Sequence, residues 1–381
     1  MIDGARELSP IARAAAVLAP RAVSAPVNTV IPVILRATEA ESIGARMRVG
    51  GMRIVDRAIR QLARLRDARV IIATDGSIPL PRRLPRNIER RDVDAASAIA
   101  ALQQELGPET TTVGADTVWL QPGRFDKGIQ VVDAASRRLA ADSVYADLQR
   151  DAGGIFDRII NRKISTALTR LLFANLPVTP ALLTLLAGFV GVYGALMIAT
   201  GTAPNVVLGF AVLQGYIVLD GCATVLARLR LHQSALGAWL DTMTGDFVGI
   251  VLMLAVGRAL WAHGGTFLDM KMAAAGAAMT VFYAAVTYRE LVRQHEGDVS
   301  KLRWWFAYGQ SLRSVSGAGS QSIKAVAMLG RRDVLIAAGL GLAAFDQLPV
   351  VLLLLLIVAI SRAGAALIQL FTPDWRIRPP V

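Results

Sequence analysis

The chain has 381 residues, of which 54% are hydrophobic and 18% are charged, whereas a typical soluble protein has about 25% charged residues. Its formal net charge of +12 suits an anionic membrane surface or phosphate-bearing ligands, and the basic residues lack the interleaved aromatic residues that single-stranded nucleic-acid binding uses. The single cysteine, Cys222, excludes an internal disulfide and a multi-cysteine metal site.

The N-terminal half predicts a small α/β domain over residues 27–150. Residues 1–26 are expected to form only a leader, because Arg13 and Arg21 interrupt the apolar stretch that a signal peptide requires. We expect strands at 29–35, 69–73 and 111–120, and helices at 53–65 and 95–106. Alternating strands and helices predict a small Rossmann-like domain with a parallel sheet.

Residues 151–178 predict a basic amphipathic helix that precedes the first membrane span. Apolar residues alternate there with Arg158, Arg162, Lys163 and Arg170. Such a helix is expected to lie in the membrane interface. The alternative is a soluble helix that packs on the α/β domain, and we favour the interface.

Six apolar segments between residues 179 and 373 predict a bundle of six transmembrane helices, followed by a short tail at 374–381. The expected spans are 180–200, 206–226, 236–254, 273–286, 334–349 and 350–371. Basic residues concentrate in the N-terminal half, in the turn at 228–232, in the loop at 288–332 and in the tail. This asymmetry predicts a multi-pass protein of the cell inner membrane with both termini in the cytoplasm.

Acidic residues occur at the ends of two neighbouring spans. Asp220 lies late in the second span, Asp241 and Asp246 lie early in the third, and Arg228 lies between them. Placing a carboxylate inside a membrane costs free energy. A tight turn between the two spans would bring the carboxylates close together. They could hold Mg²⁺ or Mn²⁺ against a pyrophosphate. An Asp–Arg pair that only closes the helical hairpin explains the pattern equally well.

The same segment resembles the motif of the CDP-alcohol phosphotransferases, D-x-x-D-G-x-x-A-R, then eight residues, then G-x-x-x-D-x-x-x-D. Here the sequence reads DGCATVLAR, LRLHQSAL and GAWLDTMTG. Five residues fall on the family's positions: Asp220, Ala227, Arg228, Gly237 and Asp241. The resemblance covers residues 150–371, including the GGIFDRIINRKIS segment. It implies transfer of a substituted phosphate from a CDP-alcohol to a lipid or polyol hydroxyl, with release of CMP.

The resemblance also implies roles for individual residues. Asp220 and Asp241 would bind Mg²⁺ or Mn²⁺, Arg228 would contact the diphosphate, and Gly237 would lie at the substrate. Three basic residues could bind an acceptor phosphate: Arg162, Lys163 and Arg170. Their alternative role, which we prefer, is to provide positive charge at the membrane interface. The family often forms dimers, which suggests a homodimer.

Three positions depart from the family pattern. Ala223 replaces the second Asp, Thr224 replaces the motif Gly, and Gly245 replaces the fourth Asp. In the family the first three carboxylates are understood to bind two metal ions, and the fourth acts as general base. Asp246 and His232 are weak candidates for a replacement base; Asp246 is rotated by about 100° on the helix from position 245.

The N-terminal domain resembles the opening of a nucleotidyltransferase, as in the inositol-phosphate cytidylyltransferase fusions. The match includes VGGMRIVDRAIRQLARL, and Asp116 in VGADTVW is similar to the metal-binding Asp of that fold. After the first strand, however, no glycine occurs until Gly44, and a phosphate loop usually needs one. The domain is therefore expected to be an inactive remnant.

Two functions remain open. The family resemblance favours an active phosphotransferase. The losses in both domains favour a pseudoenzyme that binds lipid or CDP-linked ligands or partners an active homologue.

Overall fold

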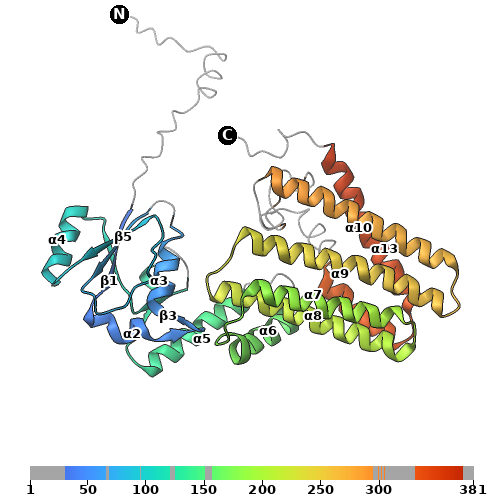
Figure 1. The fold of residues 1–381 in the computed structure, drawn as a ribbon, viewed down its shortest axis with the longest axis horizontal. Coiled ribbons are helices and arrows are strands. Elements are labelled where there is room, and N and C mark those ends of the chain that lie inside the picture. Colours follow the sequence, from blue (N-terminus) through green and yellow to red (C-terminus); the bar gives the residue numbers. More distant parts are fainter. Residues whose placement is uncertain are drawn as a thin grey trace, which may run out of the picture.

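The computed structural model describes residues 31–65, 68–94, 96–120, 125–150, 157–294, 299, 302, 304 and 331–371. The predicted leader at 1–26 and tail at 374–381 lie outside this range. Figure 1 shows an α/β domain on the left and a group of long helices on the right, with helices α5 and α6 between them.

The α/β domain is built on a four-stranded parallel sheet. Its strands are β1 (Ile31–Ala37), β4 (Ala68–Thr74), β5 (Ile88–Asp92) and β6 (Thr111–Gly114), in the order β5-β4-β1-β6. The central strands β1 and β4 are apolar along most of their length, as expected where helices cover both faces of a sheet. The predicted parallel sheet is therefore confirmed.

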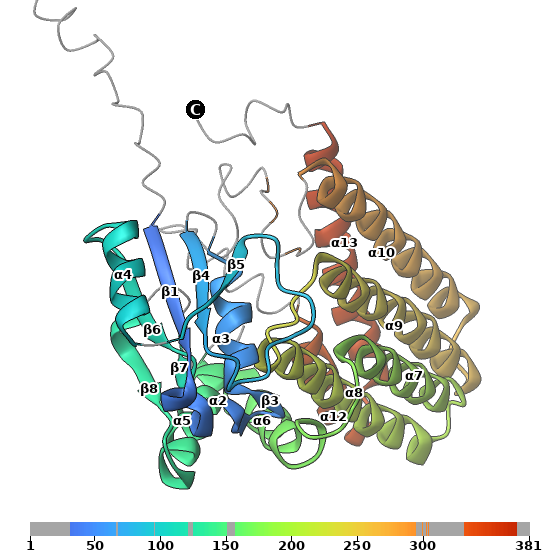
Figure 2. The same cartoon turned by 60° about the vertical axis from the view of Figure 1, so that its left-hand side comes forward.

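Helices lie on both faces of this sheet (Figure 2). Leu35 and Ile72 pack against Ile59 of α3 (Ile54–Leu62) on one face. Ile34 and Ile71 pack against α4 (Ala96–Leu106) on the other. Five short elements and one longer helix complete the domain: α2 (Ser42–Arg46), β2 (Arg48–Val49), β3 (Met52–Arg53), β7 (Thr117–Trp119), β8 (Gly128–Gln130) and the 17-residue α5 (Ala134–Arg150).

Five helices in the described part of the C-terminal half are long and apolar enough to cross a membrane. They are α7 (Pro180–Ala199), α8 (Ala203–Leu229), α9 (Ala235–Ala262), α10 (Phe267–Arg293) and α13 (Leu348–Leu370). The predicted span at 334–349 corresponds to α12 (Arg332–Ala344), which has 13 residues and reaches about 20 Å, against about 30 Å of bilayer hydrocarbon. The structure is thus compatible with a multi-pass membrane protein, and the count of six spans stays a prediction.

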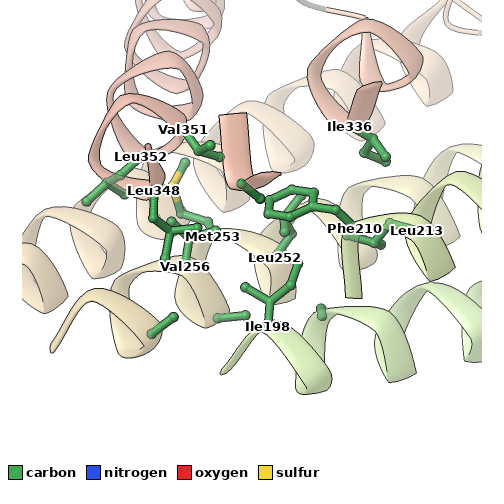
Figure 3. Close-up of a cluster of buried hydrophobic side chains, with 14 of the residues drawn as sticks. Ile198, Phe210, Leu213, Leu252, Met253, Val256, Ile336, Leu348, Val351 and Leu352 are labelled. Carbon is green, nitrogen blue, oxygen red and sulfur yellow. The ribbon is translucent and has the colours of Figure 1, made fainter. Parts of the chain in front are cut away.

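The helices share one apolar core (Figure 3). Phe210 of α8, Leu252 of α9 and Ile336 of α12 all belong to this core. Close contacts depend on glycine: a Cβ at Gly339 would lie 2.4 Å from the Phe210 ring, and one at Gly194 would lie 2.8 Å from the carbonyl oxygen of residue 209. Such small residues allow helices to approach closely in a membrane.

The predicted interfacial helix is an α-helix at its centre, α6 (Arg162–Leu168), with wider π-type turns on either side. It packs on α8, where the Ser165 hydroxyl donates to the carbonyl oxygen of Val218 at 2.8 Å. Ile164, Leu171 and Leu172 are exposed. Exposed apolar side chains on this segment suit an interfacial location, which remains a prediction.

The two halves of the chain meet in an interface that is apolar at its centre. Val49 and Tyr145 of the α/β domain pack with Val225 and Leu229 of α8. At the edge, the buried Arg57 of α3 donates from Nη1 to the carbonyl oxygen of Leu229 at 2.7 Å. Cations are favoured where the carbonyl groups at a helix C-terminus lack partners. Burial lowers the pKa of Arg57 to about 10, which leaves it charged at neutral pH. The α/β domain therefore caps α8.

We predict that Arg57→Met lowers the free energy of unfolding by about 1–3 kcal/mol, because the Leu229 carbonyl would lose its partner in a buried interface. Arg69→Met is the control, since Arg69 pairs with Glu89 on the surface and such pairs contribute about 0–1 kcal/mol. Thermal unfolding of the two variants in detergent makes the comparison. Equal melting temperatures would contradict the capping role of Arg57.

Candidate functional site

The structure brings Asp220 of α8 and Asp241 of α9 together. The two carboxyl groups are close enough to interact. The Oδ1 atom of Asp220 is buried and has no hydrogen-bond partner in the part of the chain that the structure describes. A buried carboxylate oxygen without a donor calls for a nearby positive charge.

A residue that the sequence analysis missed supplies this charge. Arg332, the first residue of α12, donates from Nη1 to the Tyr216 hydroxyl at 2.7 Å. Its guanidinium is also within electrostatic range of Asp220, Asp241 and Asp246. An arginine just before a predicted span reads in sequence as an ordinary membrane-boundary residue, so no local signal identified it.

The Arg332 guanidinium occupies the space beside Gly245. A Cβ built on Gly245 would lie 1.5 Å from Nη1 and 2.2 Å from Cζ of Arg332. The guanidinium therefore contacts the α9 backbone where any larger residue would project its side chain. Gly245 is the position at which the family resemblance places the general base.

The other two departures from the family pattern also lie in packed surroundings. Ala223 is 3% exposed and belongs to an apolar cluster with Leu183 and Leu226. The Thr224 hydroxyl donates to the carbonyl oxygen of Asp220 at 3.2 Å, within the helix. Neither residue offers a carboxylate.

The two weak candidates for a base lie in different surroundings. Asp246 accepts a hydrogen bond from the Tyr288 hydroxyl at 2.8 Å and lines the same cavity as Arg332. His232 is exposed in the turn after α8. Asp246 is thus held in place by neighbours, and His232 faces solvent.

Of the basic residues proposed for an acceptor phosphate, Arg162 lies near the acidic pair. It is buried and interacts electrostatically with Asp220. Lys163 is exposed. Arg170 forms an ion pair with Asp142 at 2.8 Å and lies over the Tyr145 ring, so it joins α5 to the segment that follows α6.

The remaining motif residues lie at helix ends. Arg228 lies in the last turn of α8. The Gly237 amide donates to the Ser234 hydroxyl at 3.0 Å and completes the N-terminal cap of α9. The capping bond gives Gly237 a structural role besides the one implied by the resemblance.

A cavity opens next to this site. It is small, about 60 Å³, is open on one side, and lies between α8, α9, α10, α12 and α13. Its polar lining comes from Tyr216, Asp246, Thr280, Arg332 and Arg362. The rest of its lining is largely aliphatic, so the cavity combines charged and apolar groups.

The residues present do not form a usual site for Mg²⁺ or Mn²⁺. These ions prefer several oxygen ligands, and the described residues contain no group of three or more Asp, Glu, His or Cys placed to hold a metal. The unpartnered Asp220 oxygen would accept a cation, but a guanidinium already lies beside both carboxylates. Binding of Mg²⁺ or Mn²⁺ remains a prediction.

The nucleotidyltransferase-like site of the α/β domain is covered by the chain itself. Asp116 is 2% exposed and accepts a hydrogen bond from Gln130 Nε2 at 2.9 Å. Helix α2 packs against it, because a Cβ at Gly44 would lie 2.8 Å from the Asp116 Cβ and 1.7 Å from the Val131 carbonyl oxygen. The segment after β1 therefore lies over Asp116 instead of forming an open phosphate loop.

Comparison with known proteins gives two partial matches, and no family model matches the chain. The "Bifunctional IPC transferase and DIPP synthase" of Aquifex aeolicus is 30% identical over 139 residues, 36% of this chain and 30% of that protein. The protein of the same name from Archaeoglobus fulgidus is 29% identical over 153 residues, 40% of this chain and 29% of that protein. The chain thus covers less than a third of each relative. Both matches support an architecture with a nucleotidyltransferase-like domain before a CDP-alcohol phosphotransferase-like one.

We predict that Gly245→Ala destabilises the protein by about 1–3 kcal/mol, because the added methyl group displaces a packed guanidinium. Gly249→Ala, one turn further along α9, is the matched control: its Cβ would meet nothing within 4 Å, and alanine favours a helix over glycine by about 0.5–1 kcal/mol. Thermal unfolding of both variants measures the difference. A Gly245→Ala protein as stable as Gly249→Ala would show that Arg332 does not occupy this space.

Proposed function

We propose that this chain is a membrane protein of the CDP-alcohol phosphotransferase type that binds phosphate-bearing lipid or CDP-linked ligands and does not catalyse the transfer. One observation carries the proposal: the Arg332 guanidinium fills the place beside Gly245 where the transfer reaction would need its base. The matches to bifunctional relatives support the family type.

The chemistry of phosphate transfer makes a base at this place necessary. The acceptor hydroxyl must lose its proton as its oxygen bonds to the phosphorus of the transferred group, while the P–O bond to CMP breaks. A general base has to lie within hydrogen-bond reach of that hydroxyl. Asp246 already accepts a hydrogen bond from the Tyr288 hydroxyl. The Arg332 guanidinium is protonated at neutral pH and cannot act as a base.

The ligand class follows from the cavity. Arg332 and Arg362 line it together with aliphatic side chains, so a phosphate could lie at the guanidinium groups and a hydrocarbon chain along the apolar wall. The charge asymmetry of the loops supports access from the cytoplasmic side of the inner membrane, with both termini in the cytoplasm. A homodimer remains a prediction from the family resemblance.

An active phosphotransferase is the second candidate. Asp220 and Asp241 lie together as the family resemblance requires, and the Asp220 Oδ1 atom has no hydrogen-bond partner among the described residues. Such a pair could contact one metal ion if the guanidinium moved aside. The two candidates differ in whether CMP is released.

We predict that the purified protein, in detergent with Mg²⁺ or Mn²⁺, releases no CMP from a panel of CDP-alcohols above the level of its Asp241→Asn variant. Binding is measured on the same samples as a rise in melting temperature with added CDP-alcohol or anionic lipid. CMP release that disappears in Asp241→Asn would instead establish the transferase. Absence of both release and binding would overturn the proposed ligand class.

A gain-of-function variant provides the converse test. Ala223→Asp, Thr224→Gly and Gly245→Asp restore the motif, and Arg332→Ala makes room for the new side chain. CMP release by the combined variant, but not by the natural chain, would show that the scaffold still accepts CDP-alcohols. This result would identify the four changed positions as the cause of inactivity.

A further inference from the structure

The most unusual feature of the site is a half-buried arginine, Arg332, among carboxylates at a place where the family resemblance implies metal ions. We infer that Arg332 is the permanent cation of this site, so that the natural chain has no affinity for a divalent metal there. The inference concerns the charge balance of the site and does not depend on whether CMP is released.

The position of Arg332 is fixed by contacts from two helices. The Tyr216 hydroxyl of α8 accepts its hydrogen bond at 2.7 Å, and the α9 backbone at Gly245 lies directly against its guanidinium. A planar guanidinium fits a flat surface that has no Cβ, whereas the compact ammonium of lysine would leave part of that surface uncovered. The site is therefore shaped for arginine.

The charges around the site come from several packed helices, and they balance. The carboxylates are Asp220 of α8 and Asp241 and Asp246 of α9. The guanidinium groups in electrostatic range of them are those of Arg162 on α6, Arg332 on α12 and Arg362 on α13. Among the described residues, three carboxyl groups thus face three guanidinium groups.

This balance opposes metal binding. Charges in a low-dielectric region are stable only when they are paired, so an added divalent ion would create an excess of two positive charges beside Arg332. The repulsion grows as the local dielectric constant falls. Removal of Arg332 reverses the situation, since three carboxylates would then face two guanidinium groups and would attract a cation.

The test compares Arg332→Gln with the natural chain and with Arg331→Gln. Arg331 is the matched control because it is the neighbouring residue and pairs with Asp333 instead. Each protein is heated in detergent with EDTA or with Mn²⁺, and bound Mn²⁺ is counted by electron paramagnetic resonance. We expect Mn²⁺ to raise the melting temperature of Arg332→Gln by roughly 5 °C and to leave the other two proteins unchanged.

A second variant keeps the inference testable if Arg332→Gln does not fold. In Arg332→Gln/Asp241→Asn one negative group is removed together with the positive one, so the balance is restored. This double variant should be more stable than Arg332→Gln in EDTA and should show no response to Mn²⁺. The inference is overturned if the natural chain binds Mn²⁺ through Asp241, if Arg332→Gln gains no response to Mn²⁺, or if the double variant is no more stable than the single one.

Discussion

The helical half of this protein depends on how the charges around Asp220 and Asp241 are neutralised. Carboxylates in a membrane-embedded bundle require nearby cations, and Arg332 supplies one from the first turn of α12. That residue joins α12 to the α8–α9 hairpin by a hydrogen bond and by contact with Gly245. The same interaction therefore positions a helix, places a positive charge among the carboxylates and fills the space beside Gly245.

Both domains show the same kind of change. In the α/β domain the segment after β1 forms α2 and packs on Asp116 through Gly44. In the helical domain Arg332 packs on Gly245. Each candidate site is filled by a group from the chain itself, and in both cases a glycine permits the close approach. The domains remain joined through Arg57 and the apolar interface, which fits a scaffold that is kept for binding.

The features that the sequence predicted are those that depend on residues close together in the chain, such as apolar runs and motif spacing. The apolar runs at 29–35 and 69–73 predicted a buried parallel sheet, and the apolar segments after residue 179 predicted long membrane helices. The motif spacing predicted that Asp220 and Asp241 would lie together. Strand β5 was missed because its sequence, IERRD, is that of a polar edge strand. Arg332 was missed because its partners belong to other helices far away in the sequence, and only packing shows that it fills the space beside Gly245.

Gly245 and Arg332 each constrain what residue the other position can hold. With a carboxylate at position 245, the site would carry one more negative charge and its side chain would collide with the guanidinium. With a short neutral residue at position 332, the three carboxylates would lack one counter-charge in a medium where unpaired charges are costly. Either change alone raises the energy of the site. Gly245 and Arg332 therefore act as one unit: the glycine leaves room for the guanidinium, and the guanidinium supplies the positive charge that the carboxylates require.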